Sequence, residues 1–189
     1  MEHKYVAQLN NLKIRPLIME DLELLRRWRN DITISKYLRK LKYITPSQQL
    51  LGYRESQLQP NSYYWTIVEK EKAIGALSIY NIEGTEAEIG RIMIGNVSYQ
   101  GKGYGYQSII MAMKLGFQLL KLSSYKLNVH EKNLIALHIY EKIGFIIIGR
   151  HPLNEKDVEL EMEIKKQAYE EKNPINSDII LISDIRRYR

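Results

Sequence analysis

A glycine-rich turn contains the residues whose types and spacing most directly indicate chemistry. It reads Gln100-Gly101-Lys102-Gly103-Tyr104-Gly105 and lies between a strand-like run, 88–94, and a helix-like run, 108–120. Alternate glycines let the main chain approach an anion without interference from Cβ atoms. The N–H groups that open the next helix meet that anion with the positive end of the helix dipole. The turn predicts a site for the pyrophosphate of a cofactor, with a plain strand-to-helix connection as the alternative.

Two common phosphate-binding motifs do not fit this turn. In the P-loop a Gly-Lys pair is followed by Ser or Thr, whereas Lys102 is followed by Gly103. The dinucleotide fingerprint would begin at Gly101 and require glycine at position 106, where the sequence has Tyr106. If the turn binds a phosphate, it belongs to another class of protein.

The composition is that of one ordinary globular domain. The chain has 189 residues, of which 44% are hydrophobic and 26% charged. It lacks the run of about 18 apolar residues that a membrane-spanning helix requires. The first residues, Glu2, His3 and Lys4, do not resemble a secretory signal, so we expect a cytoplasmic location and no membrane association.

Residues that bind metals or form thiolates are scarce. The sequence has no cysteine, which excludes disulfides, thiol nucleophiles and cysteine-ligated zinc. Its four histidines, His3, His130, His138 and His151, show no paired spacing of metal ligands. We therefore expect no metal.

The net charge of +6 suits an acidic partner, which could be nucleic acid, an anionic membrane or an acidic small molecule. The basic residues are dispersed, and solvated helix faces account for most of them. A nucleic-acid footprint would show a known module with interleaved aromatic residues. Nucleic acid is therefore an unlikely partner on this pattern, although a basic RNA-binding face stays as the alternative.

The hydrophobic pattern predicts a mixed sheet with helices on its faces. Thr45-Pro46-Ser47-Gln48 has the form of a capping box that opens a helix. Strands are expected at 12–17, 64–69, 73–81, 86–94, 126–130, 145–150 and 159–165, and helices at 21–30, 45–58, 108–120 and 133–143. We expect one domain over 1–165, followed by an extension, 166–189, that is an extra strand, an oligomer contact or a tail.

A second motif follows the glycine turn: Asn133-x-x-Ala136-x-x-x-Tyr140-Glu141-Lys142-x-Gly144-Phe145. Together with Gln100, Gly103 and Gly105, it resembles the GNAT superfamily of N-acetyltransferases. Arg15-Pro16-Leu17, Asp21-Leu22 and Trp28-Arg29-Asn30 further resemble the subgroup of ribosomal-protein N-terminal, spermidine and nucleotide-amino-sugar acetyltransferases. The resemblance implies an α+β fold with a twisted, mostly antiparallel sheet of six to seven strands, about four helices, and a splayed strand pair at the cofactor.

The resemblance also implies transfer of acetyl from acetyl-CoA to an amine, with roles for several residues. Backbone N–H groups from Gln100 to Gly105 would hold the pyrophosphate, Lys102 would add charge, and Gly105 would let its helix pack close to the strand. Met93 and Ile94 would offer backbone to the pantetheine arm. Asn133 would bind the cofactor arm or simply cap its helix, and Lys142 belongs to the same cofactor motif.

Tyr140 is the expected catalytic acid, because a phenol can hydrogen-bond or protonate the leaving CoA thiolate. The alternative is a core aromatic on the helix face that Ala136 and Ile143 define. Some related enzymes carry a glutamate five residues before the motif asparagine, where this chain has Asn128. We take Glu88 as the leading base and His130 as the second, with deprotonation through an ordered water as a further route.

The acceptor is expected to lie against the helices at 21–30 and 45–58 and the segment between them. That segment is basic and aromatic, with Lys36, Tyr37, Arg39, Lys40 and Tyr43. Such charge suits a nucleotide-linked amino sugar better than a polyamine, and a protein N-terminus is the next choice. The rival is a catalytically inactive binding module of the same fold. We also expect that the chain can form a homodimer.

Overall fold

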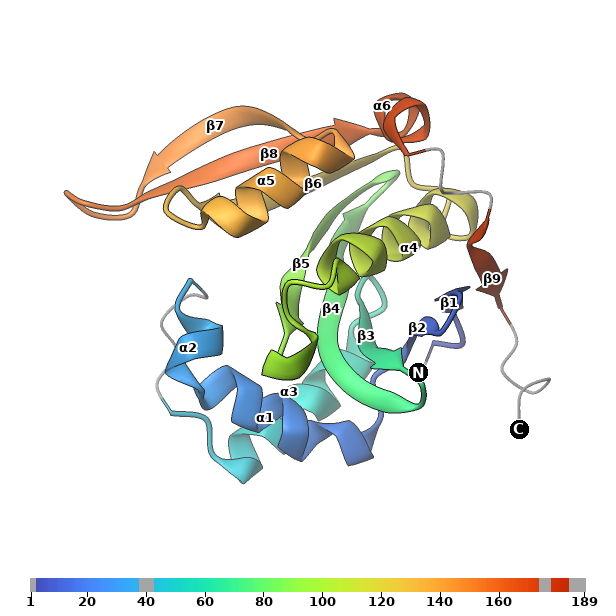
Figure 1. Cartoon of the computed structure of the whole chain (residues 1–189), viewed down its shortest axis with the longest axis vertical. Helices are drawn as coiled ribbons and strands as arrows, with labels where there is room; N and C mark the ends of the chain where they lie inside the picture. The colour runs from blue at the N-terminus through green and yellow to red at the C-terminus, as the bar shows by residue number, and fades with distance from the viewer. Residues whose placement is uncertain (1–2, 38–42, 174–177, 184–189) are drawn as a thin grey trace.

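The structure is a computed structural model that describes residues 3–37, 43–173 and 178–183 (Figure 1). Its strands form a single twisted sheet, in the order β7-β8-β6-β5-β4-β3-β2-β1-β9. The strands are β1 (Val6–Leu9), β2 (Leu12–Pro16), β3 (Tyr63–Glu69), β4 (Lys72–Glu83), β5 (Glu86–Ile94), β6 (Ser124–His130), β7 (Ile146–Pro152), β8 (Val158–Lys165) and β9 (Ile180–Ile182). The α-helices are α1 (Leu22–Asn30), α2 (Ile32–Ser35), α3 (Pro46–Leu58), α4 (Tyr104–Gln118), α5 (Leu134–Ile143) and α6 (Lys166–Lys172).

The expected fold class is confirmed, with more strands than the sequence indicated. Only β5 and β6 run parallel, and every other pair in the described sheet is antiparallel. The additional strands are β1 and β9, which pair with each other from opposite ends of the chain. They are four and three residues long, so their stability comes from this long-range pairing rather than from a local pattern.

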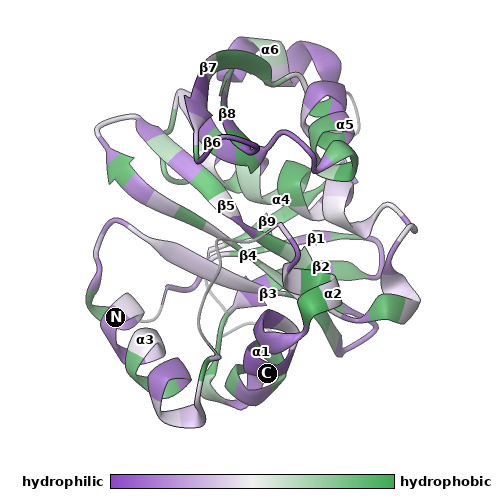
Figure 2. Ribbon diagram, turned by 90° about the vertical axis from the view of Figure 1, so that its left-hand side faces the viewer, coloured by the Kyte–Doolittle hydropathy of each residue, from purple (hydrophilic) through white to green (hydrophobic). Residues whose placement is uncertain are grey.

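Helices cover both faces of the sheet. In the view of Figure 2, strands β3, β4 and β5 cross between α4 above and α1 and α3 below. The lower layer is one apolar cluster in which Leu22, Leu25 and Trp28 of α1 meet Ala76 and Met93 of the sheet. The predicted capping box opens α3, where Thr45 Oγ1 accepts a hydrogen bond from the Gln48 N–H at 3.2 Å.

Helix α4 is the central helix, and it begins four residues earlier than expected. Its side chains at 108–113 are buried, because strands cover one side and α6 and Ile179 another. The sequence analysis expected this helix over 108–120, after the glycine turn. Gly103 does adopt a left-handed conformation, φ 79°, but Gly105 is already inside the helix.

The segment that follows residue 165 packs on the same core. Tyr169 of α6 is buried and donates a hydrogen bond to the Ile110 carbonyl at 2.8 Å. The buried Asn173 amide donates to the Ile143 carbonyl at 2.9 Å. Among the three expectations for this segment, the described residues 180–182 form an extra strand. The domain boundary at 165 stays a prediction.

Candidate active site

The strands β5 and β6 separate at the centre of the sheet, as expected for a splayed pair. They pair only from Glu86 with Ser124 to Glu88 with Lys126. A β-bulge beyond this point shifts the β4–β5 register between Ala76 and Ser78, and Arg91 takes a φ of 54°. Bulges bend a strand and end its pairing. The edge of β5 that faces β6 is therefore unpaired from about Ile89 onward and can accept an extended ligand.

The glycine turn presents a row of N–H groups at the end of β5. Gly101 and Gly103 have φ values of 73° and 79°, which glycine adopts without cost. The first helical bond of α4 runs from the Gln107 N–H to the Gly103 carbonyl, at 3.1 Å. Within the described part of the chain, the N–H groups from Gly101 to Gly105 have no protein acceptor. Such a row is a ready site for a phosphate anion.

Two details of this turn differ from the expectations. The Gln100 N–H is already donated to the Val97 carbonyl at 3.1 Å, and its side-chain amide donates to the Ile94 carbonyl at 2.8 Å. Gln100 therefore ties the turn to β5 instead of offering an N–H to a ligand. A Cβ at Gly105 would meet only Ile94, at 3.9 Å, which is an ordinary contact. Close packing of helix on strand does not require that glycine.

Positive side chains flank the turn. The Lys102 ammonium lies 5.5 Å from the centre of the Tyr99 ring, and Lys72 approaches the same ring to 5.8 Å. Lys142 lies 4.8 Å from the ring of Tyr106, in the first turn of α4. Both predicted lysines thus lie beside the turn, and Lys72 is an addition that no sequence spacing indicated.

Met93 and Ile94 contribute side chains to the core and backbone to the splayed edge. Met93 is buried against α1, and Ile94 is half-buried. The next residue, Gly95, lies so close to Trp28 that a Cβ there would come within 2.0 Å of the indole ring. This contact fixes α1 against the end of β5, next to the glycine turn.

Asn133 caps α5. Its Oδ1 accepts a hydrogen bond from the Ala136 N–H at 3.3 Å, so the capping alternative is confirmed. Its side-chain Nδ2 donates no hydrogen bond within the described residues and can turn toward a ligand. Contact with the cofactor arm stays a prediction.

Tyr140 lies on α5 with its ring in the core. Its ring packs edge-on against Phe145, with centroids 5.8 Å apart, and the residue is 8% exposed. Burial and the nearby Tyr80 raise the pKa of its phenol. Its hydroxyl has no hydrogen-bond partner among the residues that the structure describes. Tyr140 is thus a core aromatic whose protonated hydroxyl makes no hydrogen bond to the described residues.

The two expected bases have different surroundings. Glu88 occupies the last paired position before the splay, opposite Lys126 and Tyr80, and its Oε1 accepts a hydrogen bond from Asn81 at 2.9 Å. Glu88 and Tyr80 are cross-strand partners, so their side chains lie on the same face of the sheet.

His130 is engaged at both ring nitrogens. Its Nδ1 accepts a hydrogen bond from the Lys132 N–H at 3.1 Å, and its Nε2 lies 3.3 Å from Asp157 Oδ1. A hydrogen bond from Lys132 helps to lower the pKa of Asp157 to about 2, so this carboxylate is charged. To act as a base, His130 would first have to release a partner. The geometry therefore favours Glu88.

The comparisons with known proteins agree with this geometry. Residues 11–146 match the family model of the acetyltransferase (GNAT) domain. The chain belongs to the GNAT acetyltransferase family. It is 30% identical over 142 residues to spermidine N(1)-acetyltransferase of Escherichia coli, which covers 74% of this chain and 75% of that protein. It is 28% identical over 144 residues to acetyltransferase PseH of Campylobacter jejuni, which covers 76% of this chain and 83% of that protein.

A solved structure shows the same fold. Spermidine N-acetyltransferase from Vibrio cholerae, in complex with CoA and spermine, superposes with a TM-score of 0.78 at 23% identity, over 84% of this chain and 98% of that chain. This GNAT chain is therefore an N-acetyltransferase that uses acetyl-CoA. The unpartnered N–H groups of the turn fit the pyrophosphate of that donor, and the unpaired edge of β5 fits its pantetheine amides.

The expected acceptor side of the GNAT domain is partly described. Arg39 and Lys40 lie outside the described residues. The Tyr37 ring lies 5.8 Å from that of His130, so the segment after α2 reaches the end of β6. The Tyr43 hydroxyl accepts a hydrogen bond from Arg26 at 3.1 Å. The described residues at the two ends of this segment thus contact β6 and α1.

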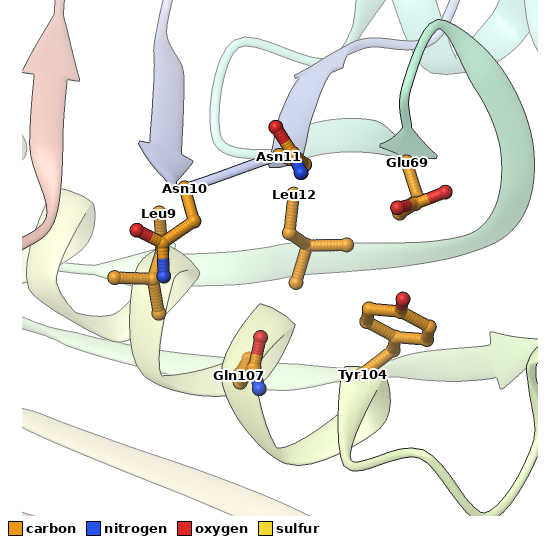
Figure 3. Close-up of a pocket in the computed structure, with 7 residues that line it drawn as sticks. All are labelled: Leu9, Asn10, Asn11, Leu12, Glu69, Tyr104 and Gln107. Carbon is orange, nitrogen blue, oxygen red and sulfur yellow. The ribbon is translucent and has the colours of Figure 1, made fainter.

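A separate open pocket lies beside the first turn of α4 (Figure 3). Asn10, Asn11, Glu69, Tyr104 and Gln107 line it together with two leucines. Because its lining includes a carboxylate and no lysine or arginine of the described residues, it does not suit a phosphate. We do not assign the donor to it.

Two further features concern metals and membranes. Among residues 3–37, 43–173 and 178–183, no three His, Asp or Glu side chains are grouped as metal ligands. No helix in that same part of the chain is long and apolar enough to cross a membrane.

Proposed function

We propose that this GNAT enzyme acetylates a primary amine of an acceptor that carries negative charge. A nucleotide-linked amino sugar is the first choice and a protein N-terminus the second. The observation that supports this proposal is the charge of the acceptor side, where Arg29 and Arg91 lie without a carboxylate partner among the described residues. A polyamine would be repelled by these cations.

In this proposal the donor lies across the splay. The N–H groups from Gly101 to Gly105 hold the pyrophosphate, with Lys102 and Lys142 near it. The unpaired edge of β5, up to Met93 and Ile94, hydrogen-bonds the pantetheine arm. The thioester then lies between β5 and the hydroxyl of Tyr140.

The proposed reaction is direct transfer. The amine nitrogen forms a bond to the acetyl carbonyl carbon, and the bond from that carbon to sulfur breaks. Tyr140 donates a hydrogen bond to the departing thiolate sulfur. The amine reacts in its neutral form and loses one proton as the amide forms, and Glu88 receives this proton directly or through water.

The relatives suggest spermidine as the main alternative acceptor. One matching relative is named a spermidine N(1)-acetyltransferase, and a structural neighbour was solved with spermine. Spermidine carries only positive charge near neutral pH, since its amines have pKa values of about 10. If the argument from charge is right, Arg29 and Arg91 repel spermidine, and it should be a poor acceptor.

The experiment is a panel of acceptors with release of free CoA thiol as the readout. We expect amine-dependent turnover, with a UDP-linked amino sugar preferred to a peptide N-terminus and both preferred to spermidine. Higher kcat/KM for spermidine would overturn the acceptor proposal while leaving the acetyltransferase activity in place.

We also propose that the chain self-associates through β7. This edge strand exposes three consecutive isoleucines, Ile146, Ile147 and Ile148, by 63%, 45% and 45%. A solved spermidine N-acetyltransferase from Vibrio cholerae is described as dodecameric. Light scattering should show an oligomer that Ile147→Lys dissociates and that Leu58→Lys, an exposed position at the end of α3, leaves intact. A monomeric wild-type protein would refute this proposal.

A further inference from the structure

Two arginines on the acceptor side lack the carboxylate partners that their neighbours have. Arg15 binds Asp21 at 2.6 Å, and Arg26 and Arg27 each bind Glu23 at 2.8 Å. Among the described residues, Arg29 donates only to the amide oxygen of the buried Gln49, at 3.2 Å. Arg91 donates only to the hydroxyl of Tyr64. Neither of these partners carries a charge.

Arg91 is held in place by its backbone and by two aromatic rings. It lies in the β5 bulge with a φ of 54°, a conformation that costs a bulky residue about 1–2 kcal/mol. Its guanidinium lies 4.4 Å from the ring centre of Tyr80 and 5.1 Å from that of Tyr64. A strained backbone position that persists next to a reaction site points to function.

Arg29 follows Trp28 in α1, and Trp28 packs in the same apolar cluster as Tyr64, the residue that accepts a hydrogen bond from Arg91. Burial, and to a lesser extent the positive charge of Arg91, lower the pKa of its guanidinium. Because arginine cannot shed its proton at any ordinary pH, the chain keeps a partly desolvated cation beside a like charge. An anion bound between them would relieve both penalties.

We propose that Arg29 and Arg91 bind an anionic group, phosphate or carboxylate, of the acceptor. This inference rests on the proposed function and names the residues that would select its substrate. The phosphates of acetyl-CoA have their own N–H groups in the glycine turn, at the end of β5 beyond the bulge.

Tyr80 packs against both Arg91 and Gly90. The centre of its ring lies 4.4 Å from the Arg91 guanidinium, and its hydroxyl lies 2.9 Å from where a Cβ of Gly90 would stand. It also contributes to the raised pKa of the Tyr140 phenol.

The test uses three acceptors that share one amino-sugar scaffold: glucosamine without an anion, glucosamine 1-phosphate and muramic acid, which carries a carboxylate. The measured quantity is the ratio of kcat/KM for each anionic acceptor to that for glucosamine. A charge-assisted pair is worth enough for a preference of about 10- to 100-fold in the wild-type enzyme. The two anionic acceptors distinguish phosphate from carboxylate recognition.

Arg91→Gln and Arg29→Gln should each lower that ratio by about tenfold or more, and Arg91→Lys should retain part of it. Arg54→Gln, on the exposed side of α3, is the matched control and should keep the full ratio. A thermal unfolding midpoint for each variant identifies loss of folding. A ratio near one in the wild type, or a ratio that survives both glutamine variants, overturns the inference.

A binding experiment distinguishes failure of this inference from failure of the proposed acetyltransfer. If no amine is acetylated, the same sugars are titrated calorimetrically into the protein saturated with CoA. Binding of glucosamine 1-phosphate or muramic acid that Arg91→Gln abolishes and Arg54→Gln keeps would still support the anion site. Equal binding of all three sugars would overturn it.

Discussion

Replacement of Tyr140 by phenylalanine isolates the proposed role of one hydroxyl. The ring stays in the core, where it packs against Phe145 at 5.8 Å. The hydroxyl has no protein partner among the described residues, so its removal breaks no internal hydrogen bond. We therefore expect the free energy of unfolding to change by less than about 1 kcal/mol. The effect on catalysis should be much larger.

The size of that effect follows from the acidity of the phenol. Burial raises the pKa of Tyr140 above its usual value of about 10, whereas a thiol has a pKa of about 8.5. Full proton transfer to the thiolate would then be uphill by more than about 2 kcal/mol, so a hydrogen bond to the sulfur is the better description. Loss of such a donor lowers kcat by about 100-fold, or about 2.7 kcal/mol.

The assay is thiol release at saturating acetyl-CoA, with Tyr125→Phe as the matched control. Tyr125 is fully buried and donates to the Met113 carbonyl at 3.4 Å, away from the splay. Its variant should lose about 1 kcal/mol of stability and keep its kcat. A Tyr140→Phe enzyme that stays folded and keeps kcat within about threefold of wild type would refute the assignment.

Four further predictions test the packing and electrostatics around the site. Gly103→Ala places a side chain at a φ of 79°, so it should cost about 1 kcal/mol of stability and raise the KM for acetyl-CoA. As a contrast, Gly52→Ala places its methyl group in open space in helix α3 and should stabilise the protein by about 0.5–1 kcal/mol in urea unfolding. Gly95→Ala drives a methyl into Trp28 and should destabilise the protein by about 1–3 kcal/mol, so an unchanged thermal midpoint would argue against the α1 contact. Burial tends to raise the pKa of Asp21, but hydrogen bonds from Arg15 and Thr66 outweigh this effect, and the net pKa is lowered. The stability that the Asp21 carboxylate contributes is therefore present above about pH 4 and is lost as the pH falls through the lower pKa of the folded state. Asp21→Asn should remove that part of the acid sensitivity in a pH series of unfolding measurements. The kcat/KM should rise with pH as the acceptor amine deprotonates. Because the pKa of the Tyr140 phenol is raised, kcat/KM should not fall again before about pH 10. A fall near pH 9 would count against Tyr140 as the hydrogen-bond donor.

The glycine turn and helix α5 could be predicted from the sequence because their signals are local. A few neighbouring residues are enough to recognise a glycine-rich turn, a helix N-cap or the glycine that ends a helix. The helix expected at 133–143 agrees with α5, which Asn133 caps and which ends at Gly144, with a φ of 118°.

The surroundings of Arg29 and Arg91, the residues proposed to bind the acceptor, could not be predicted, because they depend on contacts between distant segments. The bulge at Arg91 arises from the register between β4 and β5. The pairing of Arg29 with Gln49 joins two helices. On the donor side, the approach of Lys72 to Tyr99 was missed for the same reason, because it joins a hairpin to the glycine turn. Strand β1 was missed for the same reason, and β9 was expected only as one of three alternatives for the extension. None of these features has a fixed sequence spacing.

The most direct test of the proposed function compares two acceptors in one experiment. Initial rates of acetyl transfer from acetyl-CoA are measured with a UDP-linked amino sugar and with spermidine, and the N-acetylated products are identified by mass spectrometry. The charge of Arg29 and Arg91 predicts that kcat/KM for the sugar exceeds that for spermidine by at least about tenfold. Preferred acetylation of spermidine, or thiol release without any N-acetylated product, would contradict the account.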